Sequence, residues 1–134
     1  MGKRLDFMLF PGGKNRAMTF SYDDGVVQDR RLVELFNRYH VKGTFNLNTA
    51  TLGIQAEANF GGKHMDISKV SPEEVATLYE GHEVGGHSLC HSSLPNIGTS
   101  LAMHGLVEDR ISLENPSGKM VRCFAYPSGT YNED

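Results

Sequence analysis

Thr19-Phe20-Ser21-Tyr22-Asp23-Asp24-Gly25 is the stretch of sequence that decides the fold. Residues that favour β structure lead into two adjacent carboxylates and a glycine, a pattern typical of a strand that ends in a turn. We predict a strand over residues 17–22, with the acidic pair in the turn at its C-terminal end. Asp-Asp-Gly after a strand is most often only a turn, so its meaning depends on what the rest of the chain brings to the same place.

Strands and helices alternate along the remainder of the chain. Hydrophobic spacing predicts helices over residues 27–39 and 98–114, and a capping box at Ser71-Pro72-Glu73-Glu74 opens another helix that Gly81 ends. The predicted inner positions of the helix over 98–114 are Leu101, Leu106, Val107, Ile111 and Leu113. Further strands are predicted over residues 43–48, 83–88 and 120–126, and residues 48–69 are predicted to form a long loop with a short irregular element. This order favours a parallel sheet with helices packed on it, in a single domain over residues 1–134.

Polar residues follow the predicted strands at the same end. The strand over 83–88 delivers His87 at its C-terminal end and His91 follows it, and Pro127-Ser128-Gly129 comes after the strand over 120–126. The acidic pair occupies the equivalent place after the first strand. Parallel α/β folds build their sites at the carboxyl ends of their strands, so three separate segments are predicted to meet at one rim.

A divalent-metal site accounts for these residue types. On a helical turn, a spacing of four places the rings of His87 and His91 on one face, and Asp24 would add an oxygen ligand. Such a set leaves positions for water and substrate, as in catalytic zinc sites; zinc is the predicted ion, with cobalt, nickel or another divalent ion as alternatives. Asp23 is predicted to be the general base, because adjacent side chains diverge and it cannot easily be a ligand as well. An N–H group of Ser128 or Gly129 would stabilise the oxyanion, since proline has none.

Composition excludes several other classes of protein. The 134 residues carry a net charge of −3, and the basic residues do not cluster beyond Lys3-Arg4 and Arg30-Arg31, which argues against a nucleic-acid partner. No apolar run approaches the roughly 20 residues that cross a bilayer, so no membrane partner is predicted. The opening Met1-Gly2-Lys3-Arg4-Leu5-Asp6 does not resemble a signal peptide, which predicts a cytoplasmic chain, or an extracellular or cell-envelope one if a leader has been removed. Cys90 and Cys123 are predicted to be a reduced pair.

From about Arg16 onward the chain resembles the polysaccharide deacetylases of carbohydrate esterase family 4, the NodB-homology domain. Thr19 to Gly25 looks like the family's first motif, Thr-Phe-Asp-Asp-Gly. Gly81 to His91 is similar to the second motif, His-(Ser/Thr)-x-x-His with its Gly-His-Glu lead-in. Phe124 to Gly129 is similar to the third motif, which is looser.

The resemblance implies a fold, an activity and a set of roles. The implied fold is a partial, distorted (β/α) barrel with about four parallel strands and helices. The implied activity is metal-dependent removal of N-acetyl or O-acetyl groups from a carbohydrate. The residues assigned by the match are Asp23 as catalytic base, Asp24, His87 and His91 as metal ligands, and Tyr126, Pro127 and Gly129 as the lining of the substrate groove, beside the oxyanion donor Ser128.

Two departures from the family keep alternatives open. Ala125 stands where many members carry an arginine that orients the catalytic aspartate, and Arg122 lies nearby. The family's later motifs, including the histidine that acts as general acid, follow the third motif, whereas this chain ends at Asp134. We therefore expect metal binding with weak activity alone, in a fragment or in a homo-oligomer that covers the open half-barrel. A hydrolase of small non-sugar amides and a non-catalytic metal-binding or assembly domain are the alternative functions; an iron oxygenase is disfavoured by the second aspartate.

Overall fold

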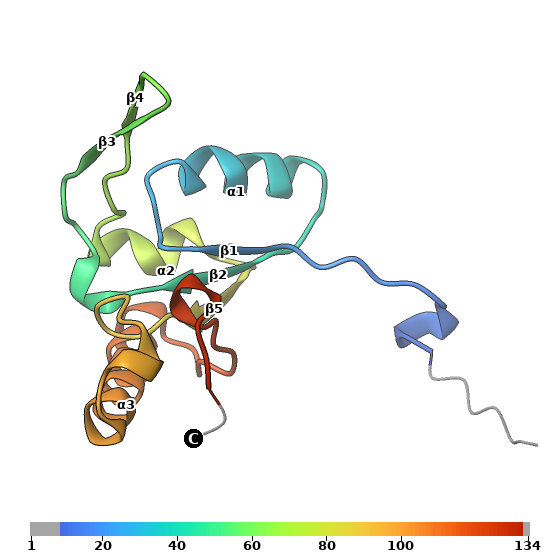
Figure 1. Ribbon diagram of the computed structural model, residues 1–134. Coiled ribbons are helices and arrows are strands. Elements are labelled where there is room, and N and C mark those ends of the chain that lie inside the picture. The colour runs from blue at the N-terminus through green and yellow to red at the C-terminus, as the bar shows by residue number, and fades with distance from the viewer. Residues whose placement is uncertain (1–8, 133–134) are drawn as a thin grey trace, which may run out of the picture.

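Three parallel strands form the central sheet of the computed structural model, which describes residues 9–132 (Figure 1). They are β1 (Ser21–Asp23), β2 (Thr44–Leu47) and β5 (Glu83–Gly86), in the order β1-β2-β5. Asp23 pairs with Asn46, and Asn46 with Gly85, so the carboxyl ends of the strands lie side by side. The predicted parallel α/β class is confirmed. The opening residues 1–6, on which the leader prediction rests, lie outside the described part.

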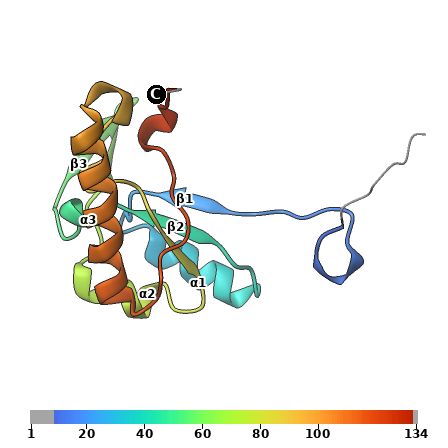
Figure 2. The same cartoon turned by 90° about the horizontal axis from the view of Figure 1, so that it is seen from below.

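Helices lie on both sides of this sheet. α1 (Asp29–Arg38) lies on one side and α3 (Thr99–Ser117) on the other, as two perpendicular views show (Figures 1 and 2). The predicted helix at Ser71 begins as a 3₁₀ turn, Pro72–Glu74, and continues as the single turn α2 (Val75–Leu78). Its capping box is present, because the N–H of Ser71 donates to the Glu74 carboxylate at 3.0 Å while the Ser71 side chain accepts from the backbone of Glu74.

The core lies on one face of β2. Phe45 and Leu47 are fully buried on that face, and the Phe45 ring lies 4.7 Å from the ring of Tyr79. Because successive strand residues point to opposite faces, Asn46 and Asn48 are buried on the other side. The hydrophobic cluster comprises Val33, Phe36, Phe45, Leu47, Val70, Val75, Tyr79, Leu113 and Val121. Burying a side chain such as Phe45 contributes about 1.5–3 kcal/mol, so this face stabilises the sheet while the other face remains polar.

The predicted loop over residues 48–69 contains a β-hairpin, so that prediction is wrong. β3 (Glu57–Phe60) and β4 (Lys63–Asp66) pair antiparallel and project from the body (Figure 1). The turn between them is Gly61-Gly62, and both glycines have positive φ, 57° and 82°. A two-residue hairpin turn of this kind requires φ > 0 at both positions, which glycine adopts without strain. The Gly-Gly pair was the signal for it.

The segment predicted as a strand over 120–126 forms only a single parallel bridge, between Gly86 and Phe124. The N–H of Gly86 donates to the carbonyl of Cys123, and the N–H of Ala125 donates to the carbonyl of Gly86, both at 3.0 Å. The segment therefore lies beside β5, where a fourth strand was expected, but it is not regular. The predicted fourth strand is therefore present only as this bridge.

The predicted inner face of α3 is largely wrong. Leu113 is fully buried, but the side chains of Leu101, Val107 and Ile111 are 59%, 48% and 49% exposed. The buried residue at the middle of the helix is instead Asp109, which faces the polar side of the sheet and is hydrogen-bonded there. A polar anchor holds this helix where a hydrophobic stripe was expected.

An exposed arm precedes the sheet. Residues 9–19 are exposed and run away from the body, with a 3₁₀ turn at Pro11–Gly13 (Figure 2). Pairing with β2 begins only at Ser21, so β1 is shorter than the predicted strand over 17–22. Within residues 9–132, the helices lack the combination of length and apolar composition that a membrane span requires.

Candidate metal centre and active site

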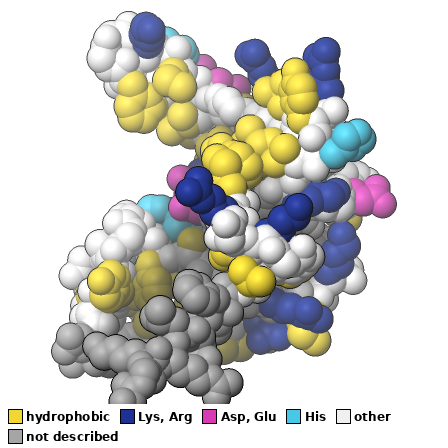
Figure 3. Space-filling model, turned by 90° about the vertical axis from the view of Figure 1, so that its right-hand side faces the viewer, with side chains coloured by type: hydrophobic (Ala, Val, Ile, Leu, Met, Phe, Trp, Pro, Cys, Tyr) yellow, Lys and Arg dark blue, Asp and Glu magenta, His cyan; other side chains and the backbone are white. Residues whose placement is uncertain are grey.

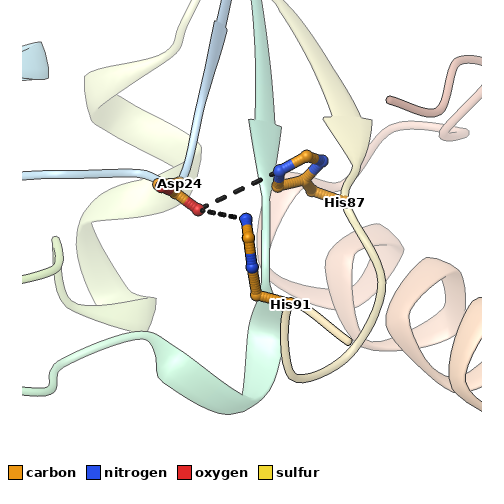
Figure 4. A group of neighbouring side chains, drawn as sticks. All are labelled: Asp24, His87 and His91. Atoms are coloured by element: carbon orange, nitrogen blue, oxygen red, sulfur yellow. Dashed lines mark ion pairs between the residues drawn. The ribbon is translucent and has the colours of Figure 1, made fainter. Parts of the chain in front are cut away.

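Asp24, His87 and His91 meet at the carboxyl edge of the sheet, as predicted from the sequence. One potential ligand atom from each lies within 4.8 Å of the others. Asp24 Oδ1 is 3.6 Å from His91 Nε2 and 4.0 Å from His87 Nε2, and the three side chains point toward one another (Figure 4). The side chain of His87 is buried, whereas those of Asp24 and His91 are 39% and 37% exposed. The cluster is thus closed on the protein side and open to solvent on the other.

These distances fit a divalent ion. Zinc bonds to imidazole nitrogen and carboxylate oxygen are about 2.0–2.2 Å long, so ligands that share one tetrahedral ion lie roughly 3–4 Å apart. The two separations from Asp24 fall in that range. The rings of His87 and His91 are 4.9 Å apart between centroids and tilted by 71°, so they approach from different directions. Two imidazoles and one carboxylate, with one open side, are the donor set of a catalytic site rather than of a closed structural one.

The two histidines are brought together by an irregular loop, not by the predicted helical turn. They follow β5, and Ser88 and His91 have positive φ, 60° and 56°. The Ser88 hydroxyl accepts the N–H of Ser92 at 3.1 Å, which holds the loop closed. Asp24 has φ 80°, and its N–H donates to the carbonyl of Asn46. Non-glycine residues adopt this region rarely, and such conformations cluster at functional sites.

His87 is held at three points. Its Nδ1 lies 2.8 Å from the carbonyl oxygen of Ala125, and because a carbonyl only accepts, Nδ1 carries the proton and Nε2 presents its lone pair to the cluster. Its backbone N–H is shared between Asp109 Oδ2 and the carbonyl of Leu47, each at 3.0 Å, and its carbonyl accepts from the amide of Asn48. The backbone carbonyl of Ala125 thus orients His87, one of the candidate metal ligands. Ala125 is also the position at which the resemblance led us to expect an arginine.

Asn46 is a residue of the site that the sequence analysis missed. Its Nδ2 donates to Asp23 Oδ1 at 2.8 Å and to Ser21 Oγ at 2.9 Å, although Asn46 is only 2% exposed. A Cβ on Gly85 would lie 2.2 Å from Asn46 Oδ1, so the glycine makes the space for this amide. The signal was an asparagine in a strand between Phe45 and Leu47, because a buried polar side chain needs a partner.

Lys69 is a second missed neighbour. Its Nζ lies 3.8 Å from Asp24 Oδ1, and its side chain is only 17% exposed. A bridge between Val26 and Lys69 brings this residue, which follows β4, against the turn that carries the acidic pair. The ammonium group places a positive charge beside Asp24 Oδ1, the same oxygen that faces the two histidines.

The third predicted segment lies beside the cluster. Tyr126 is 51% exposed, Pro127 is buried, and Ser128 has φ 56°. The N–H of Gly129 donates to the carbonyl of Tyr126 at 2.9 Å, so of the two predicted oxyanion donors Ser128 is the one not used in this turn. An open groove of about 330 Å³ is lined in part by Phe124 and Tyr126. Figure 3 shows a hollow between the projecting hairpin and the lower body, with acidic and histidine side chains along its inner wall.

Comparison with known proteins identifies the family. No curated protein sequence matches the chain. Among solved structures, a Streptococcus pyogenes deacetylase (PplD) solved with acetate matches at a TM-score of 0.75 and 18% identity, over 92% of this chain and 50% of that one. A Bacillus cereus polysaccharide deacetylase matches at 0.72 and 17%, over 90% and 36%. A Bacillus subtilis peptidoglycan deacetylase (PdaC) matches at 0.66 and 19%, over 86% and 50%.

The coverage and the sequence identity of these matches limit what they show about this chain. The chain spans half or less of the length of these solved structures, and at such low identity they show the fold alone. The family model described as polysaccharide deacetylase, by contrast, matches residues 11–134, which is nearly the whole chain. The protein therefore belongs to the polysaccharide deacetylase family and has a NodB-homology fold.

Proposed function

We propose that this protein is a metal-dependent hydrolase that removes N-acetyl or O-acetyl groups from a carbohydrate. The observation that carries the proposal is the meeting of Asp24, His87 and His91 at one edge, with the carboxylate of Asp23 next in sequence and held by a separate hydrogen bond. The family supports an acetylated carbohydrate as the substrate, since its members with solved structures include polysaccharide and peptidoglycan deacetylases.

In this proposal the chain's own residues divide the work. Asp24, His87 and His91 hold a divalent ion, with zinc as the proposed ion. When bound, such an ion lowers the pKa of a water molecule and polarises a carbonyl oxygen. Asp23 accepts the proton of the attacking water, and Asn46 keeps its carboxylate in place. The remaining assignments are the N–H of Ser128 as donor to the oxyanion, and Tyr126, Pro127 and Gly129 as the wall along which the sugar lies.

The first experiment measures metal binding by the chain itself. Titration with Zn²⁺ should give one site, and Asp24→Asn or His91→Asn should remove it. Asp23→Asn should keep it, because Asp23 is assigned to the proton and not to the ion. His64→Asn is the matched control, since His64 is exposed on the hairpin and pairs with Glu57 at 3.0 Å. The metal assignment is wrong if zinc binds equally to the wild type and to Asp24→Asn.

The second experiment measures acetate release from N-acetylated and O-acetylated oligosaccharides, with and without a chelator. We expect release to require the ion and to fall at least 100-fold in Asp23→Asn, in line with the usual contribution of a general base. His64→Asn should behave as the wild type. Release that is unchanged by Asp23→Asn, or that persists with the metal removed, would refute the proposed mechanism.

A further inference from the structure

Asp109 is a buried carboxylate that joins three segments near the metal cluster. It lies in α3, is 1% exposed, and accepts three hydrogen bonds. Its Oδ1 accepts from the N–H and the hydroxyl of Thr49, at 2.9 and 2.8 Å. Its Oδ2 accepts from the N–H of His87 at 3.0 Å, an N–H that also donates to the carbonyl of Leu47 at the same distance. Thr49 opens the turn after β2, and His87 follows β5. A single side chain therefore fixes the ends of two neighbouring strands to one helix.

Keeping a carboxyl group in this position has an energetic cost. Burial raises the pKa of Asp109, and the hydrogen bonds from Thr49 and His87 only partly oppose that effect. A hydrophobic residue would pack against the sheet without this cost, as Leu113 does one turn further along the same helix. The carboxylate therefore contributes more to the positions of Thr49 and His87 than to stability, because its two oxygens require donors in two fixed places.

We propose that Asp109 is a positioning residue for the metal centre, which sets the backbone of His87 so that its Nε2 faces Asp24. This inference rests on the proposed binding of a metal by Asp24, His87 and His91. The bond from the His87 N–H to the carbonyl of Leu47 holds this residue against the end of β2, but the loop after His87 is irregular, so the sheet alone does not define the direction of the ring. The carbonyl of Ala125 sets the rotation of the imidazole, and the Asp109 bond sets the place from which the side chain starts. Residues that orient metal ligands in this way typically change metal affinity by 10–100-fold when they are mutated.

Two substitutions distinguish positioning from general support. Asp109→Asn can still accept both bonds from Thr49 through its oxygen, but its NH₂ group then faces the N–H of His87, and two donors oppose each other. Thr49→Val removes one hydrogen bond from the other oxygen of the same carboxylate and leaves the bond to His87 in place. Both variants perturb the same buried network, but only Asp109→Asn perturbs the ligand.

The test is a Zn²⁺ titration of the wild type and both variants, with Co²⁺ absorption spectra as a second readout of ligand geometry. We expect a 10–100-fold weaker dissociation constant and an altered Co²⁺ spectrum for Asp109→Asn. Thr49→Val should lose thermal stability and keep both metal readouts of the wild type. An unchanged dissociation constant in Asp109→Asn, or an equal loss in both variants, would overturn the proposal.

Asp109→Glu covers the case in which Asp109→Asn does not fold. It keeps the charge and both acceptor oxygens but moves them by one methylene group, so we expect weaker Zn²⁺ binding and an altered Co²⁺ spectrum for this variant too. Wild-type values of both readouts in Asp109→Glu would overturn the positioning role. Failure of the proposed function gives a different result, because the wild type then binds neither ion.

Discussion

Asp29 gives the protein a pH-dependent stability that can be calculated in advance. It is the first residue of α1, is 4% exposed, and accepts a hydrogen bond from the hydroxyl of Tyr79 at 2.7 Å. Burial raises the pKa of its carboxyl group from 3.8 to about 6, although the Tyr79 hydroxyl and the charge of Lys69 act in the opposite direction. The folded protein therefore holds the Asp29 proton more tightly than the unfolded chain does.

The sign and size of the effect follow from these two pKa values. Below pH 3.8 the carboxyl is protonated in both states and carries no penalty. As the pH rises toward 6, the unfolded chain ionises first, and stability falls until the folded protein has also ionised. At about 1.4 kcal/mol per pH unit, the difference between 3.8 and about 6 corresponds to a loss of about 3 kcal/mol, complete above pH 6.

Urea denaturation of the wild type and Asp29→Asn between pH 4 and 7 tests this calculation. Asparagine accepts the Tyr79 hydrogen bond but does not ionise, so the variant should gain relative stability as the pH rises, by up to about 3 kcal/mol at pH 7. A chelator is present throughout, because an ion at Asp24 would change the field around Asp29. Other carboxyl groups affect both proteins equally and cancel in the difference. A constant difference between the two curves across this range would refute the reasoning.

Two further substitutions test the packing that builds the site. In Gly85→Ala the new Cβ would lie 2.2 Å from Asn46 Oδ1 and 2.6 Å from Cys123 Sγ, so we expect a loss of about 1–3 kcal/mol in urea denaturation. Gly105→Ala is the control and should not lower stability, because Gly105 lies inside α3 and its new Cβ would meet only Leu89 Cβ, at 4.0 Å. Phe45→Ala empties the centre of the core and should lower the free energy of unfolding by about 3–5 kcal/mol; Phe60→Ala, at a side chain that is 60% exposed, should have a small effect in the same measurement.

The candidate site was predicted best where the residue types and the order of the strands both pointed to the same edge of the sheet. Asp24, His87 and His91 were predicted as a cluster because each follows a strand, and parallel strands bring their carboxyl ends to one edge. That argument needed only the order of the elements, so it holds although the expected helical turn between the histidines is a loop and the strand over 120–126 is a single bridge. The hairpin was missed because its turn signal, Gly61-Gly62, lay in a stretch judged only by its polarity.

The residues that support the cluster could not be found in the same way. Asn46 and Asp109 have no motif of their own, and each acquires its role only when another segment supplies its partner. A local pattern nevertheless indicates where to look. In β2 and the residue that follows it, Phe45 and Leu47 alternate with Asn46 and Asn48, all of them buried, so one face is core and the other must satisfy buried amides.

That alternation explains how so small a sheet carries both stability and chemistry. The apolar face of β2 packs against α1 and α2, while its polar face meets the acidic pair and the loop that carries the histidines. Because a strand has a side-chain period of two, a shift of one residue in register would exchange these faces. It would place Asn46 in the core and Phe45 against Asp23. The same hydrophobic contacts that fix the register of β2 therefore also fix the position of the catalytic base proposed for this protein.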